Sequence, residues 1–112
     1  MTECRYNMTT LDLECVGHAS EDGDDGKICA ALTALMLTLA FDIDEAEANG
    51  MVKNKEIEIR SGYYHIRVEP EDEAREQMIF LLGAFVNGIY MLSETPKLKE
   101  HIKLTVEQDI EG

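Results

Sequence analysis

The sequence predicts a single α+β domain in which a mostly antiparallel sheet carries two helices on one face. Four short segments and a fifth near the C-terminus alternate apolar and polar residues, as strands with one buried face do. Two longer segments are apolar around much of a helical wheel, as buried helices are. The resulting order is ββ-α-ββ-α-β, and the 112 residues suffice for one domain with a modest core.

The first two strands are expected between Cys4 and Cys15, around a turn near Asn7 to Thr10. The second strand has an apolar face made of Leu11, Leu13 and Cys15. Gly17 and His18 are expected to end it.

The first helix is expected from about Lys27 to Ala48. Asp24 or Asp25 can cap its start, because a carboxylate accepts bonds from free backbone N–H groups there. The stretch Ile28 to Phe41 is apolar nearly all round, which favours a central helix, and Gly50 supplies the stop.

The remaining strands are a hairpin, Lys55 to Glu69 around Ser61-Gly62, and a final strand, His101 to Glu107. Pairing across a two-residue turn puts apolar residues opposite each other on one face and charged ones on the other. The expected pairs are Ile59 with Tyr64, Ile57 with Ile66, Glu58 with His65, and Glu56 with Arg67.

The second helix is expected to start at Pro70 and to run to about Ser93, with Pro96 closing it. Its later part is apolar on more than one face, whereas an outer helix of a two-layer domain needs only one apolar stripe. We therefore expect a homodimer formed through this helix, with Gly83 and Gly88 allowing close approach.

The net charge of −13 and the pI near 4.4 argue against binding nucleic acid through a phosphate-neutralising patch. Acidity favours solubility, or else a basic partner. The N-terminus MTECRYN has no signal-peptide pattern, and Ile28 to Phe41 is too short an apolar stretch to suggest a bilayer span. Three cysteines, an odd number, argue against a disulfide framework. We expect a cytoplasmic protein.

His18 and Cys29 lie at the two ends of a loop rich in Asp, Glu and Gly. Cys29 is expected in the first turn of the helix, where free N–H groups and the helix dipole favour a thiolate. A histidine within reach helps to deprotonate such a thiol and then protonates a leaving amine. This pattern is consistent with a cysteine nucleophile and its base.

Other interpretations of this loop remain open. The cysteine can be an ordinary core residue and the histidine a turn residue. A calcium loop fits poorly, because Gly23 and Leu32 fall where oxygen ligands are needed. A zinc site made of Cys4, Cys15, His18 and Cys29 has suitable ligand types but lacks paired C-x-x-C spacing. We expect no metal and no cofactor.

The stretch VGHA, the acidic Gly-containing loop and ICAALTAL together resemble the bacterial ribosomal-processing cysteine protease family, Prp. The segments YYHIRVE and HIKLTVE extend the resemblance over essentially the whole chain. It implies a small dimeric α+β protein that removes the N-terminal extension of a large-subunit ribosomal protein during ribosome assembly. A basic ribosomal substrate also suits the negative charge of the chain.

The resemblance implies His18 as general base and Cys29 as nucleophile. The family commonly has an aspartate three residues before the cysteine, where this chain has Gly26, and Asp25 lies one residue away. It often has a serine four residues after the cysteine, where this chain has Thr33. Asp25 and Thr33 are therefore candidate substrate-binding residues.

A third, orienting residue is not identifiable from the sequence, and Asp22, Asp24 and Asp25 are the candidates. Two alternatives to the ribosomal activity are kept. One is a phage or prophage relative that processes a capsid or scaffold protein, which the departures in the loop favour. The other is a dimer that binds a basic peptide without cutting it.

Overall fold

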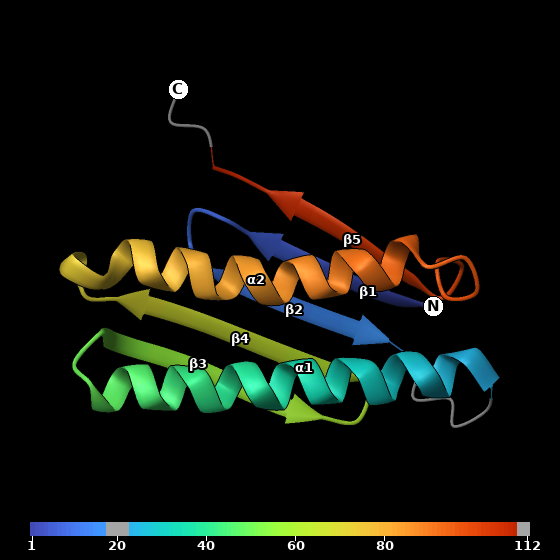
Figure 1. The fold of residues 1–112 in the computed structure, drawn as a ribbon, viewed down its shortest axis with the longest axis horizontal. Helices are drawn as coiled ribbons and strands as arrows, with labels where there is room; N and C mark the ends of the chain where they lie inside the picture. The colour runs from blue at the N-terminus through green and yellow to red at the C-terminus, as the bar shows by residue number, and fades with distance from the viewer. Residues whose placement is uncertain (18–22, 110–112) are drawn as a thin grey trace.

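The computed structural model describes residues 1–17 and 23–109, and the side chains of 23–25 are not part of that description. The elements follow the order expected from the sequence (Figure 1). They are β1 (Thr2–Asn7), β2 (Asp12–Gly17), α1 (Gly23–Ala48), β3 (Val52–Arg60), β4 (Tyr63–Pro70), the short 3-10 helix η1 (Asp72–Ala74), α2 (Arg75–Glu94) and β5 (Ile102–Glu107).

The five strands form one sheet in the order β3-β4-β2-β1-β5. Every neighbouring pair is antiparallel except β1 and β5, which run parallel. Both helices lie on the same face of this sheet, α1 on the side of β3 and α2 on the side of β1 (Figure 1). The predicted α+β class is confirmed, as is the mostly antiparallel sheet.

The register of the central hairpin is confirmed at all four expected pairs, from Glu56 with Arg67 to Ile59 with Tyr64. Gly62 in the turn has a φ of 78°, which a residue without Cβ adopts at little cost. The hairpin is longer than expected at its open end, since β3 begins at Val52 and β4 reaches Pro70. An irregularity between Val52 and Asn54 marks the added part.

The first helix begins at Gly23, not near Lys27, so the predicted start is wrong. Asp24 and Asp25 therefore lie inside the helix and do not precede it as caps. Glycine and aspartate have low intrinsic helix propensity, so residues 23–26 resemble the acidic loop before them more than the start of a helix. The predicted stop is confirmed: Gly50 has a φ of 76°, and its N–H donates to the Glu47 carbonyl over 3.0 Å.

The second helix also begins later than expected, because Pro70 is the last residue of β4 and does not open a helix. Pro70 is buried and pairs with Val52, where its lack of an N–H is tolerated at a strand end. The chain then forms η1 before α2 starts at Arg75. Thr95 follows α2 in an extended conformation, immediately before Pro96, as expected for a helix closed by proline.

The core lies between the sheet and the inner faces of the helices. Side chains of α1 that are fully or almost fully buried recur at helical spacing: Ile28, Leu32, Met36, Leu39 and Ile43. Gly88 of α2 approaches α1 within the same chain, since a Cβ there would lie 3.3 Å from Leu35 Cδ2. Gly88 therefore allows close approach of the two helices within the chain, and its expected role in a dimer, like that of Gly83, stays a prediction.

The outer helical face is apolar, and we use this name for the exposed side of α1 and α2. It carries Leu37 and Phe41 from α1, and Ile79, Phe80, Tyr90 and Met91 from α2. Both helices are long and apolar enough to cross a membrane by length and composition alone, so the earlier argument from length is wrong for α1. Each helix instead packs on the sheet through one side, as core helices do.

Candidate active site

Cys29 is half-buried, is not part of a disulfide and is the seventh residue of α1. In an α-helix only the first four N–H groups lack an intrahelical acceptor, and here these belong to residues 23–26. The N–H of Cys29 therefore lies in the hydrogen-bonded part of the helix. The expected place in the first turn is wrong by one turn, and the helix terminus acts on this residue less directly than the sequence suggested.

The backbone of Cys29 is tied to the sheet through two hydroxyl groups. Thr33 Oγ1 donates to the Cys29 carbonyl over 2.7 Å and lies 2.8 Å from the hydroxyl of Tyr64. The same Tyr64 hydroxyl lies 3.5 Å from the Cys29 carbonyl. Tyr64 belongs to β4 and is 4% exposed, so its hydroxyl finds its partners inside the protein.

Sequence reasoning placed Tyr64 only on the apolar face of the hairpin and missed this contact. A signal was available, because a buried tyrosine needs a partner for its hydroxyl. The partner could not be named, since Thr33 lies far away along the chain. Thr33 itself was expected to bind substrate, which stays a prediction.

The strand that leads to His18 is held at its end by close backbone contacts. The N–H of Gly17 donates to the Gly62 carbonyl over 3.0 Å, next to the turn that opens β4. Gly17 also pairs with Thr2, and a Cβ on Gly17 would lie 2.3 Å from Thr2 Oγ1. No larger residue fits there without movement of β1 or β2.

Several predicted site residues fall outside what the structure describes. His18 and Asp22 lie in the segment 18–22, and the side chains of Asp24 and Asp25 are likewise not described. The pairing of His18 with Cys29 and the choice of a third residue therefore stay predictions. What the structure does place is Gly17 at the end of β2, directly before this segment, and Cys29 in α1, the helix that begins directly after it.

The two other cysteines lie opposite each other in β1 and β2 and are buried, Cys4 at 1% and Cys15 at 0% exposure. A hydrogen bond with Cys4, and secondly burial, raises the pKa of the Cys15 thiol well above its ordinary range. Within residues 1–17 and 23–109, no three His, Cys, Asp or Glu side chains come together to hold a metal ion. Of the zinc alternative's residues, Cys4 and Cys15 therefore meet but Cys29 does not join them, and His18 lies outside the described residues.

The other two histidines occupy structural places. His65 Nε2 lies 2.7 Å from Asp12 Oδ1, so its partner is not Glu58, which sits opposite it in β3. His101 directly precedes β5, and its carbonyl accepts a bond of 2.8 Å from the N–H of Thr2.

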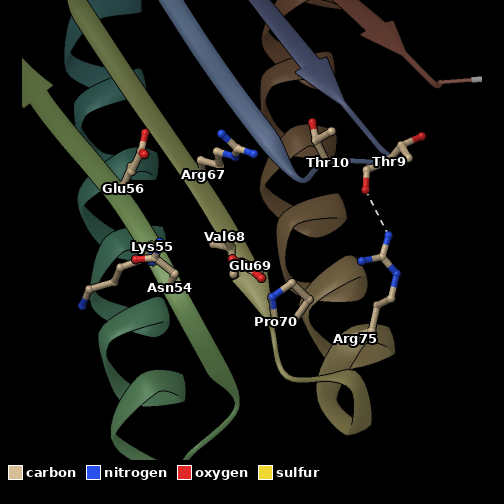
Figure 2. Close-up of a pocket in the computed structure, with 10 residues that line it drawn as sticks. All are labelled: Thr9, Thr10, Asn54, Lys55, Glu56, Arg67, Val68, Glu69, Pro70 and Arg75. Carbon is tan, nitrogen blue, oxygen red and sulfur yellow. Dashed lines mark hydrogen bonds between the residues drawn. The ribbon is translucent and has the colours of Figure 1, made fainter.

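A cavity of about 290 Å³ lies beside the end of β4 (Figure 2). It is bordered by the end of β4 at Pro70, by the turn between β1 and β2, and by the start of α2 (Figure 2). Its charged side chains have both signs: Lys55, Glu56, Arg67, Glu69 and Arg75. Because Tyr64 and Pro70 are at opposite ends of β4, this cavity is separate from the candidate active site.

No protein-family model and no curated protein matches the sequence. Solved structures do match over nearly the whole chain. SMU.848 from Streptococcus mutans superposes with a TM-score of 0.67 at 20% identity, covering 96% of this chain and 96% of that one.

The ribosomal processing protease Prp from S. aureus, solved with a covalently linked product peptide, gives a TM-score of 0.67 at 18% identity. The same protease with a substrate peptide gives 0.63 at 18% identity. Each comparison covers 96% of this chain and 100% of the other. The chain therefore has the fold of the ribosomal processing protease Prp, as the resemblance in the sequence predicted.

Proposed function

We propose that the protein is a cysteine endopeptidase with Cys29 as nucleophile and His18 as general base. One observation supports this most: a partly exposed thiol lies near the start of a core helix in a chain with the Prp fold. The other two thiols are buried in the sheet and inaccessible to a peptide. Cys29 is thus the cysteine best placed to meet a substrate.

In the proposed reaction, His18 takes the thiol proton and Cys29 Sγ attacks the scissile carbonyl carbon. The C–N bond breaks, and His18 gives its proton to the leaving amine. This leaves a thioester on Cys29. Water then attacks the thioester carbon while His18 takes a proton from the water. The C–S bond breaks, the acid leaves, and His18 returns the proton to Cys29 Sγ.

The proposed substrate is the N-terminal extension of a large-subunit ribosomal protein, removed in the cytoplasm during ribosome assembly. The similar S. aureus structures hold a product peptide and a substrate peptide, which supports peptide recognition by this fold. Ribosomal proteins are basic, and the net charge of −13 suits such a partner. Asp25 and Thr33 are the proposed substrate-side residues in this chain.

Two further candidates have their own support. The loop has Gly26 where the family commonly has an aspartate, which favours a different substrate, such as a phage capsid or scaffold protein. The placement of Cys29 in the second turn of α1, where the helix terminus favours a thiolate less, supports the alternative of a dimer that binds a basic peptide without cutting it. In both cases the fold is unchanged.

The test is to incubate the wild-type protein with a synthetic peptide of the source organism's own extended ribosomal protein. Cys29→Ala and His18→Ala are compared with Cys4→Ala, which removes a buried thiol remote from the reaction. We expect one cut, seen by mass spectrometry, with the wild type and with Cys4→Ala alone. Cleavage that persists in Cys29→Ala contradicts the proposal, and an uncut peptide contradicts the ribosomal substrate.

We also propose that the working form is a homodimer built through α2. The exposed apolar side chains of α2 support this, with Phe80 at 79% and Met91 at 63% exposure. Groups of that size remain in water only at a free-energy cost that a second copy would remove.

A further inference from the structure

The hydroxyl of Tyr64 joins β4 to the turn of α1 that carries Cys29. It lies 2.8 Å from Thr33 Oγ1, which in turn donates to the Cys29 carbonyl over 2.7 Å. A threonine hydroxyl has one proton, and Thr33 uses it on that carbonyl, so the Tyr64 hydroxyl is the donor between the two. The chain of bonds therefore runs from Tyr64 through Thr33 to the backbone of Cys29.

The same end of β4 also holds the strand that leads to His18. Tyr64 pairs with Cys15 of β2, and the Gly62 carbonyl accepts the N–H of Gly17 over 3.0 Å. The turn residue Gly62 and Tyr64 of β4 thus contact the chain on both sides of the segment that separates Gly17 from α1. A shift of α1 against β4 would change the distance between these two sides.

We propose that Tyr64 is a positioning residue, which fixes Cys29 relative to β4 and to the end of β2. This inference rests on the proposed function. Tyr64 does not touch the thiol through any contact described above; it acts on the backbone of the residue that bears it. Reacting groups need placement to within a fraction of an ångström, so a hydrogen-bonded tie of this kind affects rate more than it affects folding.

Apolar packing alone would not do the same work. A phenylalanine would fill the volume of Tyr64 but would leave Thr33 bonded only within its own helix. Helix α1 would then keep its apolar packing on the sheet but lose the directional hydrogen bond beside Cys29.

Tyr63 provides a matched control for the same substitution. Its hydroxyl donates to Glu14 Oε2 over 2.9 Å, and the Arg60 guanidinium lies 4.8 Å from the centre of its ring. It precedes Tyr64 in β4, so its side chain projects from the other face of the sheet. Tyr63→Phe therefore removes a bonded tyrosine hydroxyl without touching α1.

The experiment measures the rate at which iodoacetamide alkylates Cys29 in the folded protein, followed by mass spectrometry. The wild type, Tyr64→Phe, His18→Ala and the double variant form a double-mutant cycle. We expect roughly a tenfold loss of rate in His18→Ala, since the histidine favours the thiolate. We expect about a fivefold loss for Tyr64→Phe in the wild-type background and less than about twofold in the His18→Ala background.

Thr33→Val removes the hydroxyl between Tyr64 and the Cys29 carbonyl and leaves only their direct contact of 3.5 Å. This second variant keeps the test usable if the first folds poorly. Circular dichroism at the assay temperature checks folding in each case. We expect Thr33→Val to slow alkylation as Tyr64→Phe does, the two losses not to add, and Tyr63→Phe to match the wild type.

Two results are kept distinct. Equal rates for the wild type and His18→Ala contradict the proposed function itself. A rate that depends on His18 but is unchanged in Tyr64→Phe, or is lowered equally in both backgrounds, overturns the positioning role and leaves the protease proposal standing.

Discussion

His65 Nε2 lies 2.7 Å from Asp12 Oδ1, across the pairing of β4 with β2, although Glu58 stands directly opposite His65 in β3. Both side chains are mostly covered, with 21% exposure for His65 and 33% for Asp12. Glu58 instead lies 3.1 Å from Arg60 of its own strand, where both partners are more than half exposed. The covered pair is the one that joins two strands.

Asp12→Ala is therefore expected to lower the free energy of unfolding by about 1 kcal/mol, the usual loss for a partly buried hydrogen bond. Glu58→Ala is the control, with an expected change of at most about 0.5 kcal/mol, because exposed ion pairs contribute little. Urea denaturation of the three proteins at one pH measures both. If Glu58→Ala lowers the free energy of unfolding more than Asp12→Ala does, the bond between His65 and Asp12 is not the main stabilising interaction of His65.

The three cysteines are expected to react with thiol reagents in a fixed order. Cys29 is half-buried, whereas Cys4 and Cys15 are almost inaccessible, at 1% and 0% exposure. With iodoacetamide in native buffer we expect modification of Cys29 alone, and of the other two only after denaturant is added. Peptide mapping identifies the modified site. Equal, slow reaction of all three would contradict a catalytic role for Cys29.

The buried thiol of Cys15 is expected to make the free energy of unfolding depend on alkaline pH. The hydrogen bond with Cys4 and burial raise the pKa of Cys15, so the folded protein keeps this proton where the unfolded chain releases it. The contribution is fully present below about pH 8.5, the ordinary thiol value, and declines above it. The free energy of unfolding should fall by about 1.4 kcal/mol per pH unit for this group.

Urea denaturation at pH 8 and at pH 9.5 measures this slope. Cys15→Ala is the comparison, because it lowers stability at both pH values but removes the titrating group. Burial also raises the pKa of Tyr6, so measurements stay below pH 10, where that group would add its own effect. If the free energy of unfolding of Cys15→Ala falls with pH as steeply as that of the wild type, groups other than Cys15 cause the dependence.

Gly17→Ala is expected to disturb the end of β2. The added Cβ would lie 2.3 Å from Thr2 Oγ1, so β1 and β2 must move apart at a cost of about 1–3 kcal/mol. Because His18 follows Gly17 directly, we expect the rate of peptide cleavage to fall even at temperatures where Gly17→Ala is fully folded. Gly83→Ala is the control: its Cβ meets no atom within 4 Å, and alanine favours a helix by roughly 0.5–1 kcal/mol. Thermal melts and cleavage rates compare the two.

Phe80→Glu is expected to convert the proposed dimer into monomers. Phe80 is 79% exposed on the outer helical face, and a carboxylate there would be costly to bury against a second copy. Met8→Glu is the control, since Met8 is 43% exposed but lies in the turn between β1 and β2. Sedimentation velocity at several concentrations measures the mass. A wild type that is monomeric at all concentrations contradicts the dimer.

The hairpin shows what sequence patterns can predict. The two-residue turn at Ser61-Gly62 and the strict alternation predict one register, in which Ile57 pairs with Ile66 on the apolar face, and this register is observed. The prediction that a helix starts at Pro70 was wrong, because proline suits the first position of a helix as well as the end of a strand. The strand prevailed because Pro70 pairs with Val52 and is buried there.

The candidate site was predictable in its residues but less so in its geometry. Cys29 stood out through its place beside an acidic, Gly-rich loop. The start of α1 at Gly23 was not predictable from local sequence, because Gly and Asp have low helix propensity. The tie from Tyr64 to Thr33 joins residues that are far apart in sequence, and no local pattern reports which buried hydroxyls meet across two layers.

The parallel pairing of β1 with β5 joins Thr2 to Ile102, near the two ends of the chain. Contacts at such separation close a very long loop, which slows folding relative to local hairpins. During synthesis, β1 emerges first but cannot gain its second neighbour until β5 has left the ribosome. Until then β1 is an open edge of the growing sheet, and a nascent chain stalled before β5 would expose it to pairing with other chains.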